Sequence, residues 1–204
     1  MSDSVADKSD EQKSLNEQLM NIINLGKEDS SKEVGELIRA GADVDHISSG
    51  KDADTPLNAA ISLRNKAVVQ LLLDVGADIN KKDGDGFKPI DIAILSQEPN
   101  FLKLLIESGA DIEERANNSH KSKPLDLAVK TENTDMMEIL LAAGADVSKD
   151  DFSVTHPSPA GKLIKRAKNN IRPSPESVGL KLPEKDRPAN QADRLGERTG
   201  RKIT

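Results

Sequence analysis

Three histidines, His46, His120 and His156, are the residues of this chain best suited to metal binding or proton transfer. None of them has a second His at ligand spacing, and the chain contains no Cys. Zinc sites and thiolate catalysis both need such partners. The chain also lacks a Gly-rich phosphate loop and a nucleophile elbow. We therefore interpret the histidines as solvated turn residues and expect no metal, no other cofactor and no enzymatic activity.

The segment Asp83-Gly-Asp-Gly86 resembles the start of a calcium-binding loop. In a loop counted from Asp83, the fifth position falls on Phe87 and the twelfth on Ile94. A calcium loop needs oxygen ligands at these positions, with a bidentate Glu at the twelfth. The segment therefore fails as a calcium site, and its Asp-Gly pairs are ordinary turn residues.

Two short patterns recur along the chain. One is x-Pro-(Leu/Ile)-x-(Ala/Ile/Leu)-Ala and the other is Gly-Ala-Asp. The first begins at Thr55, Lys88 and Lys123, and the second begins at Gly41, Gly76, Gly109 and Gly144. Each of the three prolines lies 20 residues before the next Gly-Ala-Asp, whereas the connection to the following proline alternates between 15 and 13 residues. A segment of constant length joined by variable turns is typical of helical hairpins stacked in a repeat array.

At these residues the chain resembles the ankyrin-repeat family, over roughly residues 13–147. The resemblance implies an all-α solenoid of stacked helix-turn-helix units with projecting turn fingers. It also implies that the chain binds a partner protein through the fingers and the concave face, as a non-enzymatic scaffold or adaptor.

The pattern divides the chain into three regions. We predict a disordered amino terminus at residues 1–10, an ankyrin-repeat domain at 11–171 and a disordered basic tail at 172–204, where leucines are too sparse to form a core. Within the domain, the predicted repeats span about 11–45, 46–80, 81–113 and 114–147, followed by a capping helix in 148–171.

The third and fourth repeats open with lysine, at Lys88 and Lys123, where the second repeat has Thr55. A lysine side chain cannot accept a backbone hydrogen bond, so it cannot cap the helix. Asp91 and Asp126 follow three residues later, where a carboxylate can reach back to free N–H groups. We interpret them as helix caps, and the alternative is an acidic catalytic pair.

The turn inside each hairpin carries Arg64, Gln97 or Glu132 where the family has glycine. A left-handed backbone is strained for residues with a side chain. Asn adopts this conformation more readily. We therefore expect the neighbouring Asn65 and Asn133 to adopt it.

Recognition residues are expected in four fingers, at residues 46–54, 81–87, 114–121 and 149–156, because these turns project from a rigid scaffold. Phe87 is either an aromatic anchor for the partner or a side chain tucked onto the next repeat. The candidate partner-binding residues are His46, Ser49, Lys51, Lys82, Asp83, Asp85, Phe87, Arg115, Asn118, His120, Asp151 and Phe152.

Charge is distributed unevenly along the chain. Residues 1–159 hold 17 Lys and Arg against 30 Asp and Glu, a net −13, whereas residues 160–204 hold 12 against 5, a net +7. The basic end suggests an alternative function, in which the tail tethers the protein to nucleic acid or to an anionic membrane. Its composition is also similar to the tails of exported bacterial ankyrin-repeat effectors, so export to a host cell is a further hypothesis.

No segment approaches the ~20 apolar residues that span a bilayer, and the first residues lack the apolar run of a secretory signal. The acidic repeats, which offer no aromatic platform, should not bind nucleic acid. We therefore expect a cytoplasmic monomer that binds another protein and no small-molecule substrate.

Overall fold

The computed structural model of the chain describes residues 3–27, 29–49, 53–116, 122–147 and 158–183, with side chains from residue 10 onward. These residues form helices and turns, and none of them lies in a strand. The predicted all-α class of stacked helical hairpins is therefore confirmed.

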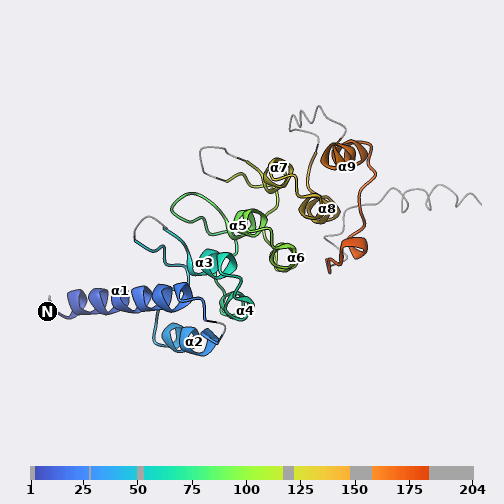
Figure 1. The fold of residues 1–204 in the computed structure, drawn as a ribbon. Helices are drawn as coiled ribbons and strands as arrows, with labels where there is room; N and C mark the ends of the chain where they lie inside the picture. The colour runs from blue at the N-terminus through green and yellow to red at the C-terminus, as the bar shows by residue number, and fades with distance from the viewer. Residues whose placement is uncertain (1–2, 28, 50–52, 117–121, 148–157, 184–204) are drawn as a thin grey trace, which may run out of the picture. The chain divides into compact units, whose positions relative to one another are not determined.

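The first of two compact units comprises residues 1–96 with 116–121 and holds two helical hairpins and the opening helix of a third (Figure 1). Helix α3 packs between α1 and α5, while α2 packs against α4. The first helices of successive hairpins thus form one layer and the second helices another. The helices are α1 (Asp3–Asn24), α2 (Ser31–Arg39), α3 (Pro56–Ser62), α4 (Lys66–Asp74) and α5 (Pro89–Leu95).

The second unit comprises residues 97–115 with 122–204 and is organised around α8. Among its described elements, α8 contacts α6, α7, α9 and a short 3₁₀ helix, η1. The elements are α6 (Pro99–Glu107), α7 (Pro124–Lys130), α8 (Thr134–Ala142), α9 (Pro159–Lys168) and η1 (Glu176–Val178).

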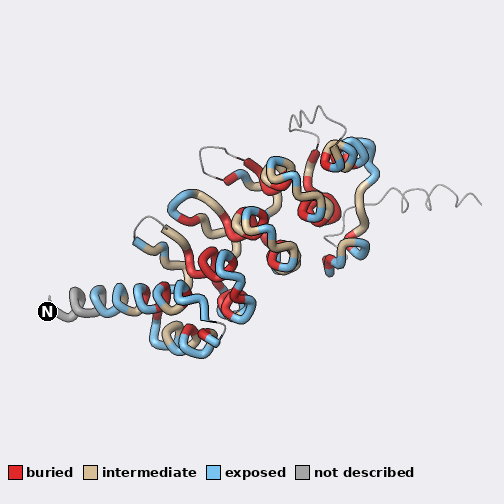
Figure 2. Tube along the Cα trace, in the orientation of Figure 1, coloured by how far each residue is buried: buried red, intermediate tan, exposed pale blue. Residues whose placement is uncertain are grey.

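Aliphatic side chains fill the interior of each unit. Figure 2 shows buried residues along the helices, and on α3 and α8 they make up most of the helix. Leu72 on α4 and Leu105 on α6 are completely buried. Phe101 is the one aromatic side chain among the buried core residues that the structure describes. Adjacent hairpins bury one another's leucines and isoleucines, so the fold needs few large rings.

The predicted helix caps are confirmed. The hydroxyl of Thr55 accepts a hydrogen bond from the Asn58 N–H at 3.2 Å. At the two lysine positions the aspartate reaches back: Asp91 accepts from the Lys88 N–H at 3.0 Å, and Asp126 accepts from the Lys123 N–H at 2.9 Å. Each helix therefore begins at its proline with a satisfied main-chain donor.

The prediction that Asn65 and Asn133 adopt the left-handed conformation is wrong. Arg64, Gln97 and Glu132 adopt positive φ, at 58°, 55° and 52°. Asn65 and Asn133 have φ of −83° and −85° and cap the second helix of their hairpins. An N-cap residue must hold its side-chain oxygen against the first turn, which requires a negative φ. The strain is therefore borne by the residue before the cap.

The ends of the packed chain differ from the predicted boundaries. Helix α1 begins at Asp3, inside the region 1–10 that was predicted to be disordered. At the other end, residues 172–183 lie against the second unit, although the tail was predicted to be disordered from residue 172. Leu180 and Leu182 are buried, and η1 contacts α8.

Two polar contacts also hold residues 172–183 in place. The Arg172 guanidinium donates to the Ala145 carbonyl oxygen at 2.7 Å, and the Lys181 N–H donates to a Glu107 carboxylate oxygen at 2.8 Å. Two leucines cannot form a core, but they can cover the apolar flank of helices that are already folded. The described part of the tail, residues 172–183, is therefore packed.

Candidate partner-binding surface

A groove of about 520 Å³ lies between α1 and the first finger. One wall is the exposed side of α1, where residues four apart share a face. The other wall is the start of the finger, and the buried Met20 forms part of the floor. The groove is lined by Lys13, Glu17, Met20, Asn21, Asn24, His46, Ser48 and Ser49.

The groove brings together two of the predicted site residues, His46 and Ser49, with side chains of α1 that the sequence analysis did not select. Hydrogen bonds hold the base of the first finger closed: the Ser48 N–H donates to the Asp54 carbonyl oxygen at 3.0 Å, and the Asp54 N–H donates to the Ser48 hydroxyl at 3.1 Å. The sequence does show the helical spacing of polar residues on α1 that could have indicated this face. It does not show that the first finger lies beside the helix.

Five predicted site residues lie outside the described residues, so the structure does not place their side chains. They are Lys51, Asn118, His120, Asp151 and Phe152.

Asp83 organises the second finger. One of its carboxylate oxygens accepts from the N–H groups of Asp85 and Phe87, at 3.0 and 2.9 Å. The other accepts from the Asn58 side-chain amide on α3, at 2.9 Å. The Asp83 side chain is only 8% exposed, so this predicted contact residue shapes the finger from within. Asp85 is exposed, and Lys82 and Phe87 are half-buried.

The second finger is also fastened to the first. The Gly84 N–H donates to the Ala53 carbonyl oxygen at 2.7 Å, and a Cβ added to Gly84 would overlap the Ala53 methyl group. Only glycine allows this approach of the two turns. The described parts of the first two fingers are thus in direct contact.

Beneath the second finger lies a cluster of buried polar residues: Asn58, Asp83, Lys88 and Asp91. Asn58 donates to Asp83 and, at 3.2 Å, to the Phe87 carbonyl oxygen. The side-chain oxygen of Asn58 and the Oδ1 atom of Asp91 are both buried without a hydrogen-bond partner. Such unsatisfied buried acceptors are rare and costly.

Burial raises the pKa of the Asp91 carboxyl from 3.8 to about 6. The hydrogen bond from the Lys88 N–H and the charges of Lys88 and Lys82 oppose this shift, while the negative charge of Asp83 adds to it. Desolvation dominates because the ionised carboxylate has left water for an interior site.

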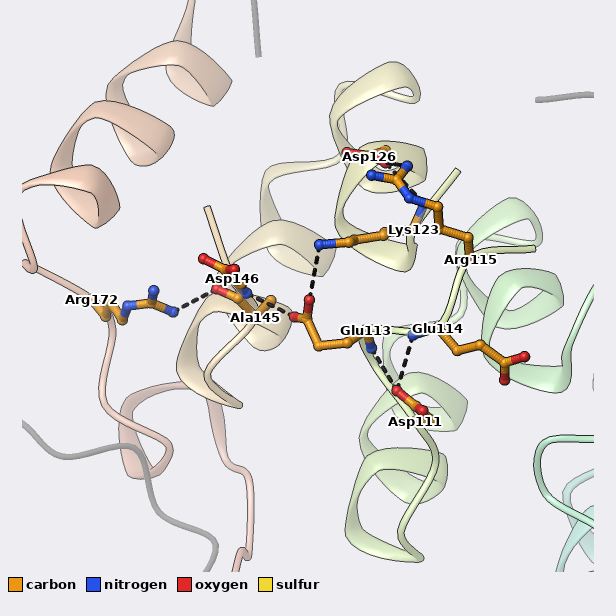
Figure 3. A network of polar contacts seen from close by, with 9 residues as sticks. All are labelled: Asp111, Glu113, Glu114, Arg115, Lys123, Asp126, Ala145, Asp146 and Arg172. Carbon is orange, nitrogen blue, oxygen red and sulfur yellow. Dashed lines mark hydrogen bonds and ion pairs between the residues drawn. The ribbon is translucent and has the colours of Figure 1, made fainter. Parts of the chain in front are cut away.

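In the second unit, ion pairs and hydrogen bonds hold residues 111–115, which lead into the third finger (Figure 3). Glu113 accepts from the Lys123 ammonium at 3.1 Å. Arg115, a predicted contact residue, is exposed and pairs with Asp126 at 3.4 Å. The Asp111 carboxylate accepts from the N–H groups of Glu113 and Glu114, at 2.7 and 3.0 Å. Part of the predicted surface is therefore occupied by internal contacts.

Sequence analysis missed a set of contacts that join successive repeats, here called the rungs. The main-chain N–H of the aspartate in a Gly-Ala-Asp donates to a side chain of the preceding repeat. Asp78 donates to Asp45 at 2.9 Å in the first unit, and Asp146 donates to Glu113 at 2.7 Å in the second. Within the first repeat, Asp43 makes a similar bond to Asn16 on α1, at 2.8 Å.

A sequence signal for the rungs existed. Two residues after the aspartate of each Gly-Ala-Asp stands a side chain that can accept a hydrogen bond: Asp45, Asn80, Glu113 or Ser148. The aspartate side chain positions this residue by accepting its N–H, as Asp43 does for Asp45 at 2.9 Å. The preceding glycine adopts positive φ, for example 90° at Gly76, which favours glycine.

Neither a metal site nor a membrane span is found in the part of the chain that the structure describes. Its His, Asp and Glu side chains nowhere gather in groups of three that could hold an ion. None of its helices combines the length and apolar character needed to cross a bilayer.

Comparison with known proteins agrees with the geometry. A family model for ankyrin repeats in three copies matches residues 19–116, and a second for the single ankyrin repeat matches residues 123–152. Ankyrin repeat and SOCS box protein 5 is 47% identical in mouse and 48% identical in cattle over 56 residues. This alignment covers 28% of the present chain and 16% of the relative. Since the family models match more than half of the sequence, the chain belongs to the ankyrin-repeat family.

Proposed function

We propose that the chain is a non-enzymatic adaptor that binds a partner protein through the first two fingers and the groove beside α1. Ankyrin repeats are generally protein–protein interaction modules, and the family is typically non-enzymatic. The groove is the observation that carries the proposal, because it lies where a finger meets the exposed side of a helix.

The lining of the groove suits a polypeptide segment. Asn21, Asn24 and Ser49 present uncharged donors and acceptors that can pair with a peptide backbone, and all three are exposed. Lys13 and Glu17 add one charge of each sign, and Met20 provides an adaptable apolar floor. Preformed concavity with a few convergent polar groups is typical of binding sites.

The test is affinity capture from cell lysate with the full chain and two variants of equal charge change. Glu17→Lys with Asn21→Arg alters the groove, whereas Glu36→Lys with Gln70→Arg makes the same changes on exposed positions of α2 and α4. We expect the groove variant to lose at least about tenfold in affinity for the captured protein, equivalent to one displaced anchor. Equal capture by both variants would contradict the proposal.

A second candidate function, tethering through the basic carboxyl-terminal region, is favoured by one observation. Lys162, Lys165 and Arg166 are exposed on α9, and no acidic residue lies between Asp151 and Glu176. Binding to duplex nucleic acid or anionic vesicles should then weaken steeply between 50 and 200 mM salt. Binding that does not respond to salt would eliminate this candidate.

The same measurement on a chain ending after Pro183 separates α9 from residues 184–204. The shortened chain retains Leu180 and Leu182, which are buried against the second unit. If it binds as tightly as the full chain, the cations of α9 carry the interaction. If binding is lost, residues 184–204 carry it.

A further inference from the structure

Helix α9 ends in a turn that holds one apolar residue in a fixed position. The Asn170 N–H donates to the Ala167 carbonyl oxygen, and the Ile171 N–H donates to the Arg166 carbonyl oxygen, both at 2.9 Å. Asn170 adopts positive φ, at 65°. These two hydrogen bonds and the left-handed residue make a Schellman motif, a common way for a helix to end. The main chain of Ile171 is therefore anchored to the last turn of α9.

The side chain of Ile171 lacks the apolar contact that usually accompanies this motif. In a Schellman motif the residue at its position commonly packs against an apolar side chain in the last turn of the helix. Here the two helix positions concerned hold Lys165 and Arg166. Ile171 is 51% exposed, and it is the one exposed large apolar side chain among the described residues of the second unit. An apolar group is thus held in water beside cations.

The exposed side of α9 is cationic. Lys162, Lys165 and Arg166 stand three and four positions apart, so they share one face of the helix, and all three are exposed. Helix α9 packs against α8, and its buried residues are Ala160, Ile164 and Ala167. No Asp or Glu occurs in residues 152–175, although residues 1–159 carry a net charge of −13. The face is therefore a local positive surface on an acidic protein.

We propose that this end of α9 is a docking surface for an anionic lipid bilayer. Lys162, Lys165 and Arg166 contact the lipid headgroups, and each cation near the membrane surface strengthens binding about fivefold. Ile171 enters the boundary between headgroups and acyl chains, where its exposed apolar surface leaves water. The backbone of a nucleic acid offers phosphates to the cations but no apolar medium for Ile171. Both groups of α9 are satisfied at once only by a lipid interface.

The inference rests on the tethering function proposed for the basic region, and it names the ligand. Sedimentation of the full chain with unilamellar vesicles tests it. Vesicles of phosphatidylcholine with about 30% phosphatidylserine are compared with phosphatidylcholine alone, in about 0.1 M salt, and a DNA duplex of random sequence is the second anionic probe. We expect the anionic vesicles to bind at least about tenfold more tightly than the neutral ones.

A first pair of variants tests the cations. Lys162→Gln with Lys165→Gln and Arg166→Gln should weaken binding to the anionic vesicles at least about tenfold. The matched control removes the same charge from residues 184–204 and should weaken binding less. It consists of Arg194→Gln with Arg198→Gln and Arg201→Gln.

A second pair of variants tests the apolar group and separates the two anionic probes. Ile171→Ser should weaken binding to the anionic vesicles about fivefold, because its apolar surface no longer enters the lipid, and should leave binding to the duplex unchanged. Leu95→Ser in the first unit replaces a leucine that is 43% exposed and should alter neither measurement.

Three results would overturn the inference: equal binding to both kinds of vesicle, no effect of Ile171→Ser on vesicle binding, or a loss of vesicle binding only when the arginines of residues 184–204 are replaced. The comparison of the two vesicles uses the unmodified protein and decides the question even if a variant does not fold. Salt-sensitive binding to the duplex alone would preserve tethering and reject this ligand, whereas no binding to either anionic probe would eliminate tethering as a whole.

Discussion

Asp91 and Asp126 follow the same Lys-Pro-(Ile/Leu)-Asp motif and make the same cap, yet their surroundings differ. Asp91 lies completely buried in the first unit with one oxygen unpaired. The Asp126 side chain, in the second unit, is 16% exposed and pairs with Arg115. The motif determines the main-chain hydrogen bond, whereas the surroundings determine how deeply the carboxylate is buried and whether an arginine pairs with it.

If both units have well-packed cores, removing a buried leucine should destabilise each of them to a similar extent. Leu72→Ala in the first unit and Leu105→Ala in the second should each lower the free energy of unfolding by about 2–5 kcal/mol, since each removes a completely buried side chain. Urea denaturation followed by circular dichroism measures both. If either substitution left the free energy of unfolding nearly unchanged, that leucine would lie outside a packed core. The two aspartates would then lie in units of unequal stability, and their surroundings could not be compared directly.

The burial of Asp91 predicts that the stability of the first unit depends on pH. Because burial raises the folded-state pKa of Asp91 to about 6, its stabilising contribution is complete below its unfolded pKa and is lost as the pH rises through 6. Asp91→Asn should therefore raise the free energy of unfolding at pH 8 by roughly 3 kcal/mol and remove this slope between pH 4 and 6.

Asp126→Asn is the control for that experiment. Its amide oxygen can still accept from the Lys123 N–H, and only a partly exposed ion pair is lost, which contributes at most about 1 kcal/mol. Unfolding curves from pH 4 to 8 for both variants decide the comparison. Parallel curves for the two variants would show that the motif, and not the surroundings, governs the carboxylate.

The smallest effect concerns the strained turn in each hairpin. Glu132 is exposed and has φ of 52°, so Glu132→Gly should stabilise the second unit by about 1 kcal/mol through relief of the left-handed strain. Thermal unfolding detects this as a small rise in Tm. An unchanged or lowered Tm would mean that the flexibility gained by the unfolded glycine offsets the relief.

Much of the fold could be predicted because hairpin length, proline and Gly-Ala-Asp are local signals. The caps at Asp91 and Asp126 followed from the inability of lysine to accept a hydrogen bond. The left-handed residues were missed because Asn65 was assigned one role from its propensity, while the hairpin required it as a cap. The conformational preference of asparagine was outweighed by the hydrogen bond that its side chain makes to the first turn of the next helix.

The candidate site was less predictable because it depends on burial and on distant partners. The sequence predicts Asp83 as an exposed turn residue. It is buried instead, and it accepts a hydrogen bond from Asn58, which lies 25 positions earlier. The groove requires α1 to lie beside the first finger, which follows only from the packing of the first repeat. Leu180 and Leu182 are buried although the tail has too few apolar residues for a core of its own, because η1 contacts α8 and the Lys181 N–H bonds to Glu107 of α6.

The rungs between repeats also make the protein tolerate mutation unequally. The donor half of each rung is a main-chain N–H, as at Asp78 and Asp146, so any amino acid except proline retains it. The acceptor half is a single side chain, at Asp45 or Glu113. The carboxylate of a donor aspartate also accepts the N–H of the residue two positions on, as Asp78 does for Asn80, so a substitution at the donor keeps the rung but loses this second bond. A substitution at the acceptor removes the rung itself.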